Sequence, residues 1–235
     1  MFASVARRLA APMAKATFRP KVEGKRNVPK RGAVILASNH LSFIDSVVIT
    51  LVAPRTVAFL AKSDYFAGAG VKGALSKAFF SGVGAVPVER GAGAAAQAAL
   101  DAGLEILENG DAFAIYPEGT RSLDGRLYRG RTGVAWLAMT AGVPVVPVGL
   151  IGTDQLQPVG SNRIRRAKVT VRFGKPLDLG TFGPATSGRA RRQATDALMA
   201  EIQKLSGQEP AGRYNEPPAA NVVERVKRAL SPERL

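Results

Sequence analysis

The chain has 235 residues, 46% of them hydrophobic, which is enough for one well-buried core and predicts a single globular domain. Its lack of cysteine excludes thiol nucleophiles, thiolate metal sites and disulfide bonds, and is typical of a reducing compartment. The formal net charge of +15 predicts an acidic partner: nucleic acid, an anionic bilayer surface or a phosphorylated substrate. Because aromatic residues make up only 6% and do not interleave with the late basic groups, stacking on single-stranded nucleic acid is disfavoured.

Residues 1–20 have the pattern of an amphipathic basic helix, in which Arg7, Arg8 and Lys15 lie off an apolar stripe. The stripe consists of Phe2, Val5, Leu9 and Met13. Such a helix can lie in the headgroup layer of an anionic membrane or pack on the protein's own core, and both interpretations remain open. No hydrophobic run of signal-peptide length precedes a small-residue cleavage pattern, so we do not expect secretion. The membrane-contacting interpretation predicts a peripheral or monotopic protein on the cytoplasmic face of a membrane.

Short β-rich runs alternate with helical stretches over residues 21–207, which predicts one α/β domain with a mixed, mostly parallel sheet flanked by helices. The predicted strands are Ala33–Ala37, Val57–Leu60, Gly84–Val88, Ala112–Tyr116, Val145–Gly149 and Lys168–Phe173. The predicted helices are Val71–Phe80, Gly93–Glu108, Thr132–Ala141 and Arg189–Leu205. The remaining residues 208–235 are expected to form a Pro- and Gly-rich linker followed by a short helix, Val222–Leu230.

The stretch from Thr132 to Thr153 contains no charged residue and is long enough to be considered as a membrane span. Pro144 and Pro147 would break a helix in its second half. We therefore expect a helix up to about Ala141 followed by a buried strand, and no transmembrane helix.

His40 is the only histidine in the chain, and it directly follows the first predicted strand in the run Asn39-His40-Leu41-Ser42-Phe43-Ile44-Asp45. A single imidazole cannot build a histidine metal cluster, but it can serve as a general base. Asp45 at this spacing can accept the Nδ1 proton and leave Nε2 free to take a proton from a hydroxyl. The alternative is a histidine packed at the end of a strand, with Asp45 capping the next helix. On either interpretation no metal site is predicted.

A second notable run, Tyr116-Pro117-Glu118-Gly119-Thr120-Arg121-Ser122, follows the predicted strand at Ala112. Gly119 permits a tight turn, after which Thr120 and Arg121 can present hydrogen-bond donors to an anion. The alternative is an ordinary turn in which Glu118 pairs with Arg121.

Taken together, these two runs resemble the family of 1-acylglycerol-3-phosphate acyltransferases and related glycerolipid acyltransferases. That family has four ordered sequence blocks, and each has a candidate between about Val22 and Phe173. The candidates are Asn39 to Asp45 for Asn-His-x4-Asp, Gly84 to Arg90 for Gly-x5-Arg, Tyr116 to Ser122 for Phe-Pro-Glu-Gly-Thr-Arg-Ser, and Val143 to Val148 for a Val-Pro-rich strand.

Some positions depart from the family pattern. Tyr116 replaces the phenylalanine of the third block, and Pro87 and Glu89 stand where the second block more often has an aromatic residue and an aspartate. The basic residue expected after the third block is Arg131 rather than a lysine. These departures concern the shape of the acceptor site, not the reaction class.

The resemblance implies transfer of a fatty acyl group from acyl-CoA or acyl carrier protein to the free hydroxyl of 1-acylglycerol 3-phosphate, making phosphatidic acid. His40 and Asp45 would form the general base pair, and no cofactor is expected beyond the acyl thioester co-substrate. Guanidinium groups suit the acceptor phosphate, so Arg90 and Arg121 are candidates, with Arg131 as a third. The family likeness also assigns Glu118, Gly119 and Thr120 to the acceptor site.

Direct transfer is expected, because the chain has no Gly-x-Ser-x-Gly motif and no cysteine to form a covalent acyl-enzyme. Its expected partners are a lysophospholipid, an acyl thioester and an anionic membrane surface, with acyl carrier protein as a further candidate and no nucleic acid. Other acceptors, such as another lysophospholipid or glycerol 3-phosphate, remain open.

Two features of the sequence also fit other classes of protein. The run Gly91 to Ala96 fits a dinucleotide-binding fingerprint, but the acidic residue that should follow the next strand is claimed by the third block. A basic membrane- or nucleic-acid-binding protein without catalysis would explain the charge, but it would leave His40, Asp45 and Glu118 without a role.

Overall fold

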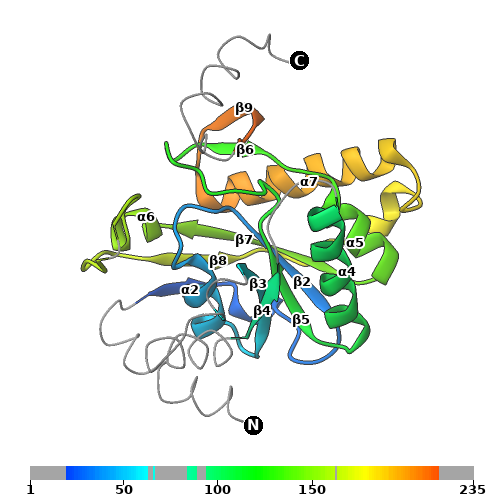
Figure 1. Ribbon diagram of the computed structural model, residues 1–235, viewed down its shortest axis with the longest axis horizontal. Coiled ribbons are helices and arrows are strands. Elements are labelled where there is room, and N and C mark those ends of the chain that lie inside the picture. Colours follow the sequence, from blue (N-terminus) through cyan, green and yellow to red (C-terminus); the bar gives the residue numbers. More distant parts are fainter. Residues whose placement is uncertain (1–19, 63–65, 67–83, 89–93, 162, 217–235) are drawn as a thin grey trace.

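The computed structural model describes residues 20–62, 66, 84–88, 94–161 and 163–216. Their centre is a seven-stranded sheet with the order β1-β8-β7-β2-β5-β3-β4 (Figure 1). Every neighbouring pair is parallel except β7 and β8, so β8 and β1 run opposite to the other five strands. The strands are β1 (Lys21–Glu23), β2 (Val34–Ser38), β3 (Val57–Lys62), β4 (Ala85–Val88), β5 (Ala112–Ile115), β7 (Val145–Ile151) and β8 (Thr170–Phe173). The predicted α/β architecture is confirmed.

Helices cover both faces of this sheet. They are α2 (Asp45–Val52), α4 (Ala94–Glu108), α5 (Gly133–Ala141), α6 (Thr153–Leu156) and α7 (Gly188–Ser206), with 3-10 turns η1 (Lys25–Asn27) and η3 (Leu179–Phe182). On β2, Val34 and Leu36 pack with α2, whereas Ile35 and Ala37 pack with α4, α5 and α7 on the opposite face (Figure 1). Because both faces are buried, this strand is apolar from Val34 to Ala37 instead of alternating.

The uncharged stretch divides as expected. Helix α5 ends at Ala141, where Gly142 adopts φ 62° and its amide bonds the carbonyl of Ala138. A left-handed residue is favoured at a helix end when it is glycine, so the chain turns here and enters the buried strand β7. Within the described part of the chain, no helix combines the length and apolar character needed to cross a bilayer.

All six predicted strands and three of the predicted helices are found within two residues of their expected ends. Helix α2 was not among the predicted helices, although one interpretation of Asp45 placed it at the start of a helix; five of the eight residues of α2 are β-branched, which favours strands. Burial of Val48, Ile49 and Val52 against the sheet outweighs that preference. The expected helices at residues 1–20, Val71–Phe80 and Val222–Leu230 lie outside the described residues.

The segment that we expected to be a linker contains a strand. Residues Pro210–Tyr214 form β9, which pairs in parallel with β6 (Leu127–Arg129) in a separate two-stranded sheet. The Leu127 amide also donates to the carbonyl of Glu209 at 2.8 Å. Most of β9 is exposed, so backbone pairing with a distant segment holds it rather than an apolar pattern of its own. The sequence carried no signal for that pairing.

Candidate active site

The site lies at the carboxyl ends of the neighbouring parallel strands β2, β5 and β7. Ala37 on β2 pairs with Ile115 on β5, and a predicted site residue, His40 or Glu118, lies three residues after each member of this pair. This register brings the two loops together, and the His40 amide donates to Glu118 Oε1 at 2.9 Å. Loops beyond the carboxyl ends of parallel strands are the usual place for ligands in such sheets.

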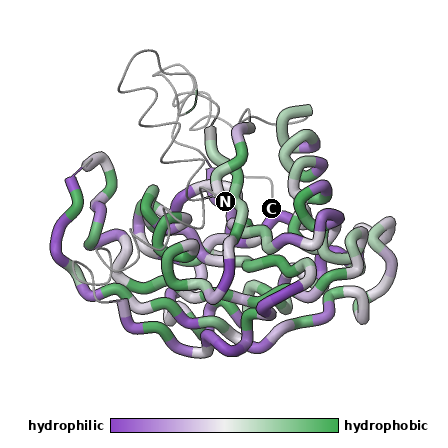
Figure 2. Tube along the Cα trace, turned by 90° about the horizontal axis from the view of Figure 1, so that it is seen from below, coloured by the Kyte–Doolittle hydropathy of each residue, from purple (hydrophilic) through white to green (hydrophobic). Residues whose placement is uncertain are grey.

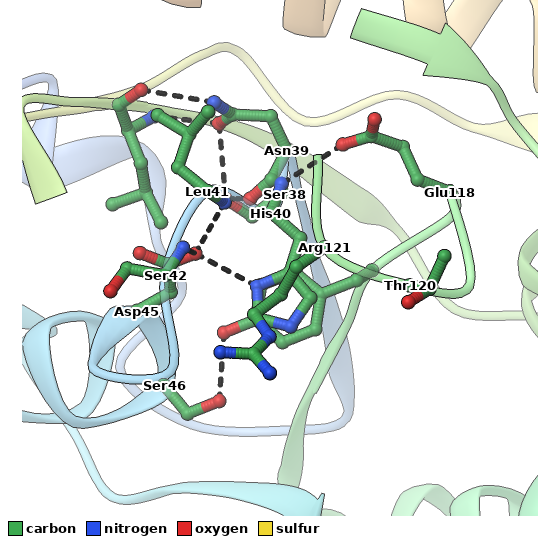
Figure 3. Close-up of polar contacts among 12 residues, drawn as sticks. Ser38, Asn39, His40, Leu41, Ser42, Asp45, Ser46, Glu118, Thr120 and Arg121 are labelled. Atoms are coloured by element: carbon green, nitrogen blue, oxygen red, sulfur yellow. Dashed lines mark hydrogen bonds and ion pairs between the residues drawn. The ribbon is translucent and has the colours of Figure 1, made fainter. Parts of the chain in front are cut away.

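Asp45 is fully buried, and it binds the loop before it. One oxygen, Oδ2, accepts hydrogen bonds from Nδ1 of His40 at 2.8 Å and from the amides of Leu41 at 2.7 Å and Ser42 at 2.8 Å (Figure 3). Asp45 begins helix α2, so the chain between the two residues is a compact turn closed by these bonds. Because the carboxylate accepts at Nδ1, that nitrogen is the donor and the lone pair of a neutral imidazole lies on Nε2.

The ring of His40 stacks on the ring of Tyr116, with centroids 3.9 Å apart and planes inclined by 12°. The Tyr116 hydroxyl lies 2.7 Å from Oγ of Ser46 on α2. The tyrosine that departs from the family pattern therefore has its polar group satisfied and still supports the imidazole through its ring face. His40 is largely buried, but 11% of its side chain remains accessible. The ring is thus held in position and still reaches solvent.

Glu118 is also fully buried, and both of its oxygens bind the main chain. Oε1 accepts from the amide of His40 and Oε2 from the amide of Tyr128, each at 2.9 Å. Burial raises the pKa of Glu118 to about 7, against these two hydrogen bonds, which favour the charged form. The alternative in which Glu118 pairs with Arg121 is therefore wrong: the carboxylate fixes the histidine loop to the segment that starts β6.

The turn of the third block is built around Gly119, which has φ 80° and donates its amide to the carbonyl of Tyr116 at 3.0 Å. A Cβ at this position would come within 2.9 Å of Nε and 3.0 Å of Cδ of Arg131. The guanidinium of Arg131 in turn donates to the carbonyl of Asn215 at 3.2 Å. Glycine is needed here both for the backbone conformation and for the close passage of Arg131.

Arg121 lies next to the histidine loop, because the amide of the following Ser122 donates to the carbonyl of His40 at 2.8 Å. Arg121 is exposed, and Figure 3 shows its side chain extending toward the His40 ring. Thr120 precedes it on the same loop. No ion pair of Arg121 with another described residue is present. Arg90 lies outside the described residues.

Asn39 is a residue whose role sequence reasoning missed. Its fully buried side chain bonds both backbone groups of Leu150 on β7: Nδ2 donates to the carbonyl at 3.0 Å, and Oδ1 accepts from the amide at 2.7 Å. The amide side chain thus continues the β2–β7 ladder past the end of β2. The signal was its place immediately before the only histidine.

The segment after α7 also contacts the site, which the sequence did not predict. Oε1 of Gln208 accepts from Nδ2 of Asn39 at 2.7 Å, and its Nε2 donates to the carbonyl of Gly125 at 2.8 Å. Nδ2 of Asn215 donates to the carbonyls of Thr120 at 3.3 Å and Arg121 at 3.0 Å. We call residues 208–215 the C-terminal strap. It ties together the loops that follow β2 and β5.

The α/β fold and the arrangement of this site agree with the family resemblance of the sequence, and comparison with known proteins identifies the family. The acyltransferase family model matches residues 19–151, which include His40, Asp45 and the Glu118 loop. The chain therefore belongs to the acyltransferase family.

Among its relatives is the chloroplast 1-acyl-sn-glycerol-3-phosphate acyltransferase of Brassica napus, 32% identical over 183 residues that cover 77% of this chain and 51% of that protein. The chloroplast enzyme of the same name from Arabidopsis thaliana is 30% identical and covers 77% and 49%. The chain thus spans about half the length of these curated relatives. The crystal structure of the 1-acyl-sn-glycerophosphate acyltransferase PlsC from Thermotoga maritima superposes with a TM-score of 0.65 at 27% identity, covering 86% of this chain and 79% of that one.

Proposed function

We propose that this protein transfers a fatty acyl group from an acyl thioester to the free hydroxyl of 1-acylglycerol 3-phosphate, giving phosphatidic acid. Family membership and the printed names of the relatives support this acceptor. The observation that carries the proposal is the 2.8 Å bond between Nδ1 of His40 and Asp45, because it leaves Nε2 as the basic nitrogen.

In the proposed reaction, Nε2 of His40 takes the proton of the acceptor hydroxyl as its oxygen attacks the thioester carbonyl. A C–O bond forms, the C–S bond breaks, and the imidazolium returns its proton to the leaving thiolate. Asp45 stabilises the imidazolium and holds the ring in its orientation, as the carboxylate does in other histidine-dependent acyl transfers. The ring of Tyr116 supports the imidazole by stacking on one of its faces.

Direct transfer, without a covalent acyl-enzyme, is consistent with how the hydroxyl groups near His40 are bound. The hydroxyl of Ser42 donates to the carbonyl of Gln157, that of Ser46 bonds Tyr116, and that of Ser38 donates to the carbonyl of Asn39. Each is bonded to another group in place of the imidazole, and a serine nucleophile would need the imidazole as its base. The donor, acyl-CoA or acyl carrier protein, acts as co-substrate, and no further cofactor is proposed.

Arg121 is the proposed ligand of the acceptor phosphate, since it is exposed and makes no ion pair within the described residues. Arg131 takes part less directly, because its guanidinium is bound to the Asn215 carbonyl and lies against Gly119. Arg90 stays a proposal from the sequence alone. Gly119 and Thr120 shape the loop that presents Arg121, and Glu118 fixes that loop to the histidine. An anionic membrane surface at the cytoplasmic face would supply the acceptor lipid.

The test is a transfer assay with purified protein, 1-acylglycerol 3-phosphate and oleoyl-CoA or oleoyl-acyl carrier protein. We expect phosphatidic acid by mass in equal amount to the thiol released, and His40→Ala should lower turnover by about two to four orders of magnitude. Circular dichroism and thermal melting check that the variant is folded, and glycerol 3-phosphate and other lysophospholipids complete the acceptor panel.

Several outcomes would count against the proposal. A folded His40→Ala variant with near-normal turnover would remove the histidine as base. A burst of thiol release in the absence of any acceptor would instead indicate an acyl-enzyme. Preference for another acceptor in the panel would keep the reaction class and change the substrate.

A further inference from the structure

A loop next to the active site has features that the proposed reaction does not use. It connects β7 to β8 and leaves from the carboxyl end of β7, which is the edge of the sheet where His40 lies. The link is direct, because Oγ of Ser42 donates to the carbonyl of Gln157 at 2.8 Å. Figures 1 and 2 show α6 and this loop standing out from the body of the sheet.

Four cations and two aliphatic side chains are exposed along this loop. Within the described residues none of the four cations forms an ion pair, and Val159 and Ile164 keep 52% and 53% of their surface accessible. The cations are Arg163, Arg165, Arg166 and Lys168. We call these six residues the basic loop. The amide of Arg165 bonds the carbonyl of Leu156 at 2.7 Å, so the loop folds back on its own start.

We propose that the basic loop binds an anionic phospholipid bilayer and sets the active-site edge of the sheet against it. Unpaired cations attract anionic headgroups, and exposed aliphatic side chains gain by entering the boundary between headgroups and acyl chains. This deepens the proposed function and rests on it, because a lipid acceptor would then reach His40 from the surface that the loop contacts.

The two aliphatic side chains favour a bilayer over other acidic partners. A nucleic acid backbone offers phosphates but no apolar layer for Ile164, which lies between two of the arginines along the chain. An acidic carrier protein is the remaining candidate for the same charges. Binding of the carrier protein would depend on the arginines and would not require Val159 and Ile164 to enter an apolar phase. Substitution of the two aliphatic residues therefore distinguishes a bilayer from a carrier protein.

The experiment measures sedimentation of the full chain with vesicles of two parts phosphatidylcholine to one part phosphatidylglycerol. The variant Arg163→Gln/Arg165→Gln/Arg166→Gln should partition onto these vesicles about 100-fold more weakly. Each cation near the surface strengthens partitioning by roughly fivefold, and the variant lacks three of them. The variant Val159→Ser/Ile164→Ser should also bind these vesicles more weakly. Transfer to a short-chain acceptor that is soluble in monomeric form should be unchanged in both, while transfer to a vesicle-embedded acceptor falls.

A matched control removes three cations from the opposite edge of the sheet. Arg26, Lys30 and Arg31 are exposed and lie between β1 and the start of β2, away from His40. Arg26→Gln/Lys30→Gln/Arg31→Gln should keep binding within about threefold of the unmodified protein.

Three results would overturn the inference. Equal losses in the control and loop variants would mean that only net charge matters. Unchanged vesicle binding in the loop variants, with a raised KM for acyl carrier protein, would assign the loop to the carrier instead. Unchanged vesicle binding together with an unchanged KM for acyl carrier protein would mean that the basic loop binds neither partner. Because vesicle binding is read without turnover, a failure of the proposed reaction is seen separately.

Discussion

Three hydrogen-bond donors converge on one oxygen of Asp45, and they come from consecutive residues of the same turn. The two amide bonds fix the carboxylate to the backbone, so the position of the His40 ring follows from the backbone and not from a flexible side chain. This is the kind of support that keeps a general base within reach of its substrate. Glu118 has a similar place one strand away, where it binds the His40 amide itself.

The buried carboxyl of Glu118 predicts a specific pH dependence of stability. Because burial raises its pKa from 4.5 to about 7, the folded protein holds a proton between these values that the unfolded chain has released. The free energy of unfolding should therefore fall as pH rises through this window, by roughly 3 kcal/mol in total. Urea denaturation of the unmodified protein and Glu118→Gln at several pH values measures it. The variant should lack this contribution, and parallel curves would contradict the assignment.

Arg121 gives a second prediction at this scale. Arg121→Ala should raise KM for 1-acylglycerol 3-phosphate by about 10- to 100-fold with a smaller effect on kcat, because a charge-assisted hydrogen bond contributes about 1.5–3 kcal/mol. Steady-state kinetics against acceptor concentration provides the measurement. Arg189→Ala, an exposed residue at the start of α7, is the matched control and should behave as the unmodified protein. An unchanged KM in Arg121→Ala would exclude it as the phosphate ligand.

Among the elements, the C-terminal strap has the least expected role. Its strand β9 pairs with β6, and its side chains form hydrogen bonds with the loops after β2 and β5. The carbonyls of Thr120 and Arg121 thus have a fixed partner in Asn215, which defines the backbone that presents the Arg121 guanidinium. Small displacements of a substrate-binding group have large effects on rate, so the strap is expected to act on catalysis without contacting the reacting atoms.

Asn215→Asp tests this role of the strap. Aspartate has nearly the same shape but cannot donate to the two carbonyls, so kcat/KM for the acceptor should fall by about tenfold at a temperature where circular dichroism shows the variant to be folded. Glu209→Ala is the control, since Glu209 bonds β6 through its carbonyl and not its side chain. Full activity of the folded Asn215→Asp variant would show that the two donated bonds do not position the loop.

For the whole molecule, two hydrophobic layers keep the sheet rigid beneath the site. Alternate residues of β2 belong to different layers, and Leu198 on α7 is fully buried in the layer shared with α4 and α5. The loops that hold His40 and Glu118 therefore extend from strands that cannot shift independently. The net charge of +15 contributes to association with acidic partners and not to the fold.

Leu198→Ala should lower the free energy of unfolding by about 2–5 kcal/mol, because it leaves a cavity that the packed layer fills only partly. Urea denaturation measures the change, and Arg189→Ala on the same helix should stay within about 0.5 kcal/mol of the unmodified protein. At temperatures where the variant is folded, KM for both substrates should be unchanged. A loss below 1 kcal/mol would mean that this layer is not tightly packed.

The sequence by itself determined the α/β class, six strands of the central sheet and the break between α5 and β7, and it offered the pairing of His40 with Asp45 as one of two interpretations. These depend on patterns within short stretches: apolar runs, prolines at known positions, and two residues five apart that one turn can join. The tertiary structure alone decided the extent of α2, the binding of Glu118 to backbone amides, and the contact of the strap with the site. Asn39 and Gln208 are 169 positions apart and Asn39 and Leu150 are 111 apart. The contact with Leu150 satisfies backbone N–H and C=O groups, which nearly every residue possesses. The residue types in the sequence therefore do not predict which distant segment a buried amide will bind.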